Sequence, residues 1–368
     1  MVASARDTAV APPVDNPMGT DGFEFVEFAH PEPAQLAALF GTMGFEPVAR
    51  HRSKNVTLYR QGDINYVLNS EADSFAARFA REHGPSVCAI GFRVHDAGAA
   101  VRRARALGEK VILAQAGPME LTIPAIEGVG GALIYLVDRY GEKGSIWDVD
   151  FRWLGARDPG PEGVGLFEID HLTHNVRRGR MDPLAEWYVR LFNFRQIRYF
   201  DIEGRLTGLH SRAMTSPCGK IRIPINESAD DTSQIEEFLA HYKGEGVQHI
   251  ACACRDIYET VERLRARGLD FMPAPPDAYY EAVNTRLPGN GEDIARLRRL
   301  GVLIDGESEE GQKPKLLLQI FSKTVIGPIF FEFIQRKGDE GFGEGNFRAL
   351  FESIEEDQLR RGVLKSAD

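Results

Sequence analysis

Three residues in the C-terminal half, His171, His249 and Glu332, form the set with the clearest chemical potential. They lie 78 and 83 residues apart, and each falls in a short apolar segment that predicts a β-strand. Because alternate residues of a strand face the same side of a sheet, the three side chains can share one face. Two neutral imidazoles and one carboxylate leave coordination positions open, and this arrangement suits a non-haem Fe(II) ion that activates dioxygen.

An internal repeat singles these residues out. Three pairs of segments align in the same order: 87–108 with 247–268 at a constant offset of 160, 23–30 with 167–174, and 137–141 with 334–338. In the first half, this alignment gives Glu27, Ala89 and Tyr135 as the counterparts of the three candidates. One copy therefore carries the set and the other has lost it.

Structural roles are the alternative for each candidate taken singly. A histidine in a strand is more often a satisfied structural residue than a metal ligand. Glu332, between phenylalanines, could be a buried acid paired with an arginine. The coincidence of all three at positions matched by the repeat favours the metal site.

Each half of the repeat predicts the same order of elements. A strand, a helix and a β-rich stretch are expected at 23–29, 33–43 and 56–69, and again at 167–173, 182–192 and 197–225. A second strand and helix follow at 87–108 and 247–268, with Asp96 and Asp256 as helix caps and Gly108 and Gly268 as the closing glycines. The pattern predicts an α+β fold of four tandem βαβββ modules, with antiparallel pairing inside each.

The prolines and glycines between residues 155 and 164 break both periodicities and predict a linker. We expect a disordered tail over 1–20, a metal-free N-terminal domain over 21–156, and a linker over 157–164. A catalytic, iron-binding C-terminal domain is expected over 165–368.

Composition excludes several classes of function. The chain has 368 residues and a formal net charge of −10, which argues against nucleic acid as a partner. No apolar run approaches the ~18–20 residues needed to span a bilayer, and the first 22 residues do not have the pattern of a signal peptide. The four cysteines are too few and too irregular for a secreted disulfide framework. We expect a soluble cytoplasmic protein with reduced thiols and no membrane partner.

The glycine-rich run over 338–346 carries three acids and lacks the Lys-Ser/Thr of a phosphate loop, so nucleotide binding is rejected. This run predicts a hinge before a C-terminal helix, in which Phe347, Leu350, Phe351 and Ile354 recur at helical spacing. The helix could be a mobile lid or an ordinary docked helix, and the residues favour neither.

His174 lies on the opposite strand face from His171 and predicts a structural role. Cys252 and Cys254 form a C-x-C pair without a second pair, which is a weak metal signal. They are expected to be buried thiols.

Taken together, these segments resemble the bacterial 4-hydroxyphenylpyruvate dioxygenase family across residues 20–365. Six stretches carry the resemblance: 170–175, 224–227, 248–250, 318–321, 331–336 and 341–347. The resemblance implies the vicinal-oxygen-chelate fold, with two homologous domains that are each an open β-barrel with outer helices. It also implies that His171, His249 and Glu332 bind iron, the same three residues that the repeat selects.

The resemblance further implies a substrate pocket. Its members would be Ser211, Asn226, Gln234, Gln248, Gln319, Phe321, Phe342, Asn346, Phe347 and Phe351, with Gln319, Asn346 and Phe347 acting directly in catalysis. Amides that orient a phenol and rings that hold an arene are the lining that an aryl pyruvate requires. Gln248 is adjacent to His249 and should point to the other face of a regular strand. It can line the same pocket only if the strand is twisted at its start.

The implied activity is Fe(II)-dependent conversion of 4-hydroxyphenylpyruvate and O2 to homogentisate and CO2, a step of tyrosine and phenylalanine catabolism. The alternatives are 4-hydroxymandelate synthase, which oxidises the benzylic carbon instead, and a metal-free ligand-binding protein of the same fold. The resemblance also implies a homo-oligomer, a tetramer or a dimer.

Overall fold

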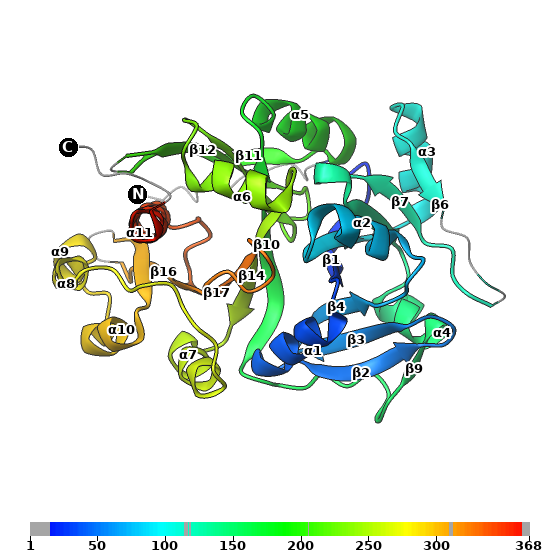
Figure 1. Ribbon diagram of the computed structural model, residues 1–368, viewed down its shortest axis with the longest axis horizontal. Helices are drawn as coiled ribbons and strands as arrows, with labels where there is room; N and C mark the ends of the chain where they lie inside the picture. The colour runs from blue at the N-terminus through cyan, green and yellow to red at the C-terminus, as the bar shows by residue number, and fades with distance from the viewer. Residues whose placement is uncertain (1–14, 114–116, 118, 205, 309–311, 363–368) are drawn as a thin grey trace, which may run out of the picture.

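The chain folds around two β-sheets in a computed structural model, which describes residues 15–113, 117, 119–204, 206–308 and 312–362 (Figure 1). A nine-stranded sheet takes its strands from Thr20 to Trp153, and an eight-stranded sheet takes its strands from Leu166 to Lys337. Of the predicted tail over 1–20, residues 1–14 lie outside the described part, and Thr20 already begins the first strand.

The N-terminal half, drawn blue to green in Figure 1, contains nine strands and four α-helices. Its elements are β1 (Thr20–Ala29), α1 (Pro33–Thr42), β2 (Glu46–His51), β3 (Val56–Gln61), β4 (Ile64–Asn69), α2 (Phe75–His83), β5 (Ser86–Val94), α3 (Ala97–Ala106), β6 (Val111–Leu113), β7 (Pro124–Glu127), η1 (Val129–Gly131), β8 (Leu133–Val137), η2 (Gly141–Lys143), α4 (Ile146–Asp150) and β9 (Phe151–Trp153).

The C-terminal half begins with the long strand β10 and ends with a long helix. Its elements are β10 (Leu166–Val176), α5 (Met181–Phe192), β11 (Arg195–Glu203), β12 (Gly208–Thr215), β13 (Arg222–Ser228), α6 (Gln234–Tyr242), β14 (Gly246–Cys254), α7 (Ile257–Ala266), α8 (Asp277–Glu281), α9 (Val283–Arg286), α10 (Ile294–Leu300), β15 (Leu303–Glu307), β16 (Lys315–Phe321), β17 (Phe330–Lys337) and α11 (Glu344–Arg361).

Strand pairing confirms the four predicted βαβββ modules. In each module the three later strands pair antiparallel, and the last of them lies parallel to the first, as β4 does to β1 and β17 does to β14. Antiparallel pairs β1–β5 and β10–β14 then join the two modules of each half into one sheet. The strand order of the second sheet is β11-β12-β13-β10-β14-β17-β16-β15, so β10, β14 and β17 lie at its centre.

The two predicted helix caps are confirmed. Asp96 accepts a hydrogen bond from the backbone N–H of Ala99 at 2.8 Å, and Asp256 accepts one from Glu259 at 3.0 Å. These bonds satisfy N–H groups that have no partner inside the helix, and they fix where α3 and α7 begin. The repeat in sequence is therefore a repeat in local structure.

Helix α11 spans the gap between the two edge strands of the second sheet. Near its start, the backbone N–H of Gly345 donates to Asp305 of β15 at 2.7 Å. Farther along, the buried carboxylate of Glu355 accepts from the backbone N–H groups of Leu206 and Thr207, which follow β11, both at 2.8 Å. The structure therefore shows this helix docked across the opening of the curved sheet (Figure 1).

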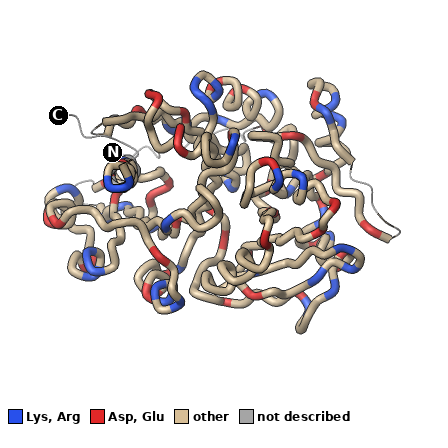
Figure 2. Tube along the Cα trace, viewed as in Figure 1, with Lys and Arg blue, Asp and Glu red and all other residues tan. Residues whose placement is uncertain are grey.

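Charged residues of both signs alternate along the trace of the described chain (Figure 2). Lys and Arg lie interspersed with Asp and Glu in this view, and the formal net charge of the chain is −10. Among the described residues, no helix combines the length and the apolar character that crossing a membrane requires.

Candidate metal centre

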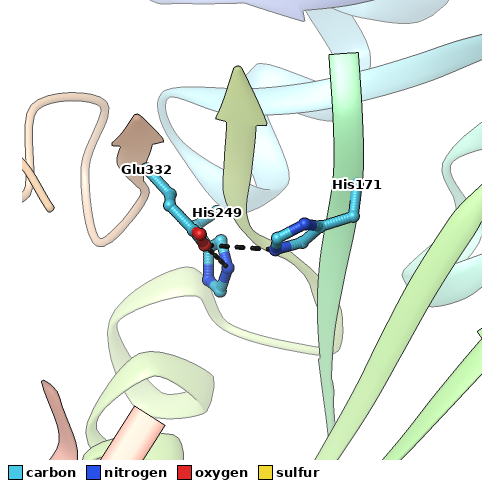
Figure 3. Close-up of side chains that lie close together, drawn as sticks. All are labelled: His171, His249 and Glu332. Carbon is cyan, nitrogen blue, oxygen red and sulfur yellow. Dashed lines mark ion pairs between the residues drawn. The ribbon is translucent and has the colours of Figure 1, made fainter. Parts of the chain in front are cut away.

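The three central strands of the second sheet bring the candidate ligands together. His171 comes from β10, His249 from β14 and Glu332 from β17 (Figure 3). The register places His171 opposite Ala251 and Ala251 opposite Glu332, while His249 precedes Ala251 by two residues on the same face. Neighbouring strands lie about 4.8 Å apart, so this register converges three side chains that are distant in sequence.

Glu332 lies between the two imidazoles. Its Oε2 is 3.1 Å from His171 Nε2 and 3.3 Å from His249 Nε2, and the three potential ligand atoms all lie within 4.8 Å of one another. All three residues are buried. Within the described chain, the polar partners of Glu332 are these histidines and Gln319, so the alternative of an acid paired with an arginine is wrong.

The pKa values of the cluster follow from burial and from the shared carboxylate. Burial raises the pKa of Glu332, but the two imidazoles outweigh burial and lower it to about 2. Burial lowers the pKa of His171, but Glu332 and Asp170 outweigh burial and raise it to about 9. For His249 the effect of burial is the larger, and its pKa lies below the ordinary value. A divalent cation bound here would take the place of the proton on His171.

A second side chain orients each candidate ligand. The contacts are His171 Nδ1 to Asp170 Oδ1 at 2.8 Å, His249 Nδ1 to Gln248 Oε1 at 2.9 Å, and Gln319 Nε2 to Glu332 Oε1 at 2.7 Å. In both histidines the outer partner engages Nδ1, and Nε2 is directed toward the shared carboxylate; His249 Nε2 also contacts Thr173 Oγ1 at 3.0 Å. Such outer contacts fix the tautomer and the ring orientation of metal-binding histidines. The donor set and its supports therefore fit a divalent transition-metal ion.

The three side chains face a small cavity of about 30 Å³. Four residues of the implied substrate pocket line it, namely Ser211, Gln319, Phe321 and Phe342, together with Thr173, Phe200 and Pro224. A water molecule needs roughly 10–15 Å³ of such space, so the cavity has room for about two. An aryl pyruvate therefore requires the surrounding side chains to move.

Gln234 and Gln248 line a neighbouring pocket of about 720 Å³. Phe330 also lines this pocket, and its ring stacks on the His249 ring with 4.8 Å between centroids. The neighbouring pocket therefore adjoins the metal side of the cavity. Strand alternation predicted that Gln248 points away from the face of His249. In the structure the Gln248 side chain lines the neighbouring pocket, and its Oε1 still contacts His249 Nδ1.

Asn226 lies outside both linings, but it marks a polar patch beside the cavity. Its Oδ1, Ser211 Oγ and Asn175 Nδ2 are buried atoms without a hydrogen-bond partner among the described residues. Ser211 and Asn226 are direct partners across β12 and β13, and Asn226 Nδ2 donates to Asn175 Oδ1 at 3.3 Å. Buried polar atoms without partners are rare, so this patch is a candidate for ligand recognition.

The remaining implied residues lie in or near α11. Asn346 is buried and donates from Nδ2 to Gln319 Oε1 at 2.8 Å. Phe351 is buried, but it does not line the cavity. Its ring packs against Gly204, so closely that a Cβ atom on this glycine would come within 2.6 Å of the ring. Phe347 belongs to the helix, but its side chain lies outside the described part of the structure.

Several residues of the site were absent from the prediction. Thr173 and Phe200 line the cavity, and Asp170 supports His171. Two of them carried a sequence signal, because Asp170 and Thr173 flank His171 in the same strand. Phe200 carried none, since it reaches the cavity through its pairing with Ser211 across β11 and β12.

His174 packs away from the cavity, as predicted. Its Nε2 is 3.0 Å from the hydroxyl of Tyr188 in α5, and burial lowers its pKa to about 3. Cys252 and Cys254 are free and buried, and burial raises the pKa of each thiol to about 12. These residues belong to the core.

The N-terminal sheet fills the equivalent place with aromatic side chains. Gly91 pairs with both Phe25 and Tyr135, as Ala251 pairs with His171 and Glu332. Phe25 rather than Glu27 therefore stands where His171 does, and the counterpart inferred from the ungapped alignment was wrong by two residues. The register irregularities around Phe25 and His171 fall at matching places, so the structural offset between β1 and β10 is two residues longer than the alignment gave. Such a shift keeps the same strand face, which is why sequence alternation did not show it.

The Phe25 ring covers this position. A side chain on Gly91 would come within 2.5 Å of it, and its centroid lies 5.7 Å from Tyr135 and 5.8 Å from Trp147. Among the described residues, the group that could hold a metal ion is that of His171, His249 and Glu332, in the other sheet.

Metal-saturated protein is therefore expected to hold one divalent ion per chain. Elemental analysis after removal of loosely bound metal, with the protein quantified by amino-acid analysis, measures this ratio. Two tightly held ions per chain would contradict the assignment of the N-terminal sheet.

Comparisons with known proteins agree with this geometry. Residues 14–152 match the family profile "Hydroxyphenylpyruvate dioxygenase, HPPD, N-terminal", and residues 168–293 match the "Glyoxalase/Bleomycin resistance protein/Dioxygenase superfamily". The chain is 60% identical to 4-hydroxyphenylpyruvate dioxygenase of Pseudomonas aeruginosa, over 95% of this chain and 97% of that protein. It is 61% identical to hemolysin VllY of Vibrio vulnificus, over 96% and 99% of the two chains.

Among solved structures, a substituted variant of 4-hydroxymandelate synthase from Streptomyces coelicolor superposes with a TM-score of 0.80. It is 25% identical in sequence, and the match covers 93% of this chain and 100% of that one. The fold is thus shared by a protein named as a mandelate synthase and by the family of this chain's dioxygenase relatives.

Proposed function

We infer the activity of this chain from its family, because it belongs to the 4-hydroxyphenylpyruvate dioxygenases. We propose that it converts 4-hydroxyphenylpyruvate and O2 to homogentisate and CO2. The observation that carries the proposal is the buried pair of imidazoles and one carboxylate on a single sheet face, within 4.8 Å of one another. This set lies in a chain 60% identical to a named dioxygenase over nearly its full length.

We propose Fe(II) as the ion that His171, His249 and Glu332 hold. Two neutral nitrogens and one carboxylate oxygen on one side of an ion leave the other side open, the arrangement typical of non-haem Fe(II) oxygenases. Bound there, Fe(II) supplies the redox chemistry that couples dioxygen to oxidation of a 2-oxo acid. A site closed by four protein ligands could not admit two reactants.

The surrounding side chains bind and orient the substrate. Phe321 and Phe342 form ring walls of the cavity and suit an arene. The unpartnered atoms of Ser211, Asn226 and Asn175 offer hydrogen bonds to a polar group on the substrate. Orienting the ring beside the metal ligands decides which carbon is oxidised, since a misplacement of about 1 Å can cost on the order of 100-fold in rate.

Enclosure is the other contribution of the protein. The cavity is buried beneath the segment that leads into α11, with Phe342 as part of its wall. Exclusion of water protects a reactive oxidant from quenching. Gln319 and Asn346 act here as positioning residues, because they connect Glu332 to the helix.

Product analysis tests the proposed activity. Iron-loaded protein given 4-hydroxyphenylpyruvate should consume oxygen and release homogentisate, with little or no 4-hydroxymandelate. The similarity in fold to the mandelate synthase variant makes hydroxymandelate the competing outcome. Chromatography against both standards separates them, and hydroxymandelate as the main product would contradict the proposal.

We also propose a cytoplasmic homo-oligomer, a dimer or a tetramer. Four free cysteines suit a reducing compartment. Strand β11 is a sheet edge on which Ile197 and Tyr199 are exposed, and such an edge offers a contact for a second copy. Sedimentation analysis of the purified chain gives the subunit number, and a monomer at micromolar concentration would contradict this part.

A further inference from the structure

We propose that the segment Asp339–Asn346 and the metal centre are coupled, so that metal binding closes the segment and closure strengthens metal binding. Arg336 is the positioning residue of this coupling at the start of the segment, and Asn346 is its counterpart at the end. The inference rests on the proposed function only in taking the buried histidine and glutamate cluster as a metal site.

The first connection runs through Arg336 to His171. Its guanidinium donates Nε and Nη2 to the two oxygens of Asp170, at 2.7 and 2.8 Å, and Asp170 holds His171 Nδ1. The third arm, Nη1, donates to the backbone carbonyls of Asp339 and Gly341 at 3.0 and 2.6 Å. One planar cation therefore ties a candidate ligand to the backbone of the segment.

Phe342 reinforces this connection. Its ring lies edge-on to the His171 ring, with 5.3 Å between centroids, and the Arg336 guanidinium lies over the Phe342 ring, 5.9 Å from the ring centroid. The Phe342 side chain is buried. Opening of the segment would therefore remove both the cation contact and the ring that covers the ligand.

The second connection runs through Asn346 to Glu332. Asn346 Nδ2 donates to Gln319 Oε1 at 2.8 Å, and Gln319 Nε2 donates to Glu332 Oε1 at 2.7 Å. Tyr279 fixes the other end, because its hydroxyl donates to Asn346 Oδ1 at 2.8 Å. Gly343, which precedes α11, packs closely on the same glutamine. A Cβ atom at this position would come within 2.6 Å of Gln319 Oε1.

Two of the three candidate ligands thus have outer partners, Asp170 and Gln319, that are themselves held by contacts leading to the segment. For His249, the hydrogen bond described for its outer partner Gln248 leads back to His249 and not to the segment. Opening the segment would leave Asp170 and Gln319 with fewer fixed contacts, and ligands held less rigidly bind metal less tightly. By thermodynamic reciprocity, a metal that favours the closed arrangement must close the segment to the same degree.

Hydrogen exchange on the full chain tests the coupling without any substitution. Co(II), added anaerobically to metal-free protein, serves as the probe, and its binding is measured by competition with a chromophoric chelator. We expect Co(II) to slow amide exchange over residues 339–346 by about 5-fold to 150-fold, the range typical of coupling between two sites. Exchange in β2, in the other sheet, serves as the internal reference.

Two substitutions test the two connections separately. Arg336→Lys keeps a positive charge beside the buried Asp170 but loses the fork that reaches the segment, and Asn346→Ala breaks the other connection without disturbing a charge. Each should weaken Co(II) binding by about 10-fold to 100-fold. Arg348→Gln, on the exposed side of α11, is the matched control and should bind Co(II) as the wild type does.

The outcomes are distinct. Weakened binding in one variant alone assigns the coupling to that connection. The proposal is overturned if Co(II) leaves exchange over 339–346 unchanged, or if Arg336→Lys and Asn346→Ala both bind Co(II) with wild-type affinity while unfolding normally. Coupling without homogentisate formation would instead contradict the proposed reaction alone, and homogentisate formation without coupling would contradict this inference alone.

Discussion

Replacement of His171, His249 or Glu332 by alanine is expected to abolish turnover. Each substitution removes one of three ligands, and the remaining pair holds the ion in an undefined geometry. Loss of an outer partner of a metal ligand typically costs 10-fold to 100-fold, so loss of a ligand itself should leave less than about a hundredth of wild-type activity. Oxygen uptake with 4-hydroxyphenylpyruvate and elemental analysis of iron measure the two effects.

A matched control separates the loss of a metal ligand from the general effect of replacing a histidine in this sheet. His210 lies in β12 of the same sheet, partly exposed and paired with Asp201, and His210→Ala should retain activity and iron. Glu332→Gln keeps the size of the side chain but not its charge, and it should behave as the alanine variant does. Near-normal activity with full iron occupancy in any of the three ligand variants would contradict the metal assignment.

Truncation after Gly341 is expected to uncouple oxygen consumption from product formation. The truncation removes Phe342 from the cavity wall and all of α11 from the opening between β11 and β15. Water would then reach the oxidant, and side reactions would consume it. More O2 should be consumed per homogentisate released, and overall turnover should fall.

The control for this truncation is a chain that ends at Gly362, which retains the whole helix. It should remain tightly coupled. Because α11 also buries Phe351, thermal unfolding must show that the shorter chain is folded before the ratio is interpreted. If a folded truncated protein stays tightly coupled, the helix is only a docked element and takes no part in shielding the site.

Local structure was predictable because it depends on neighbouring residues. The caps at Asp96 and Asp256, the alternation that placed His171 on one face, and the module pattern all follow from spacing along the chain. The repeat added long-range information, since two copies that differ at matched positions identify what one has lost. It was sufficient to select His249 and Glu332 in addition.

Tertiary structure decided what depends on register and on contacts between distant segments. The ungapped alignment assigned Glu27 as the counterpart of His171, but the strand pairing places Phe25 there, two residues earlier on the same face. A shift of two residues keeps every side chain on the same face of the strand, so the alternation in sequence does not report it.

The connection of Arg336 to Asp170, across 166 residues, is likewise invisible along the chain. The residue types of the site, and the faces that carry them, were therefore determined by the sequence alone. Which side chains support the ligands, and what closes over them, was decided by the packing of the whole chain, because hydrogen bonds and ring contacts form only between groups that the fold has already brought together.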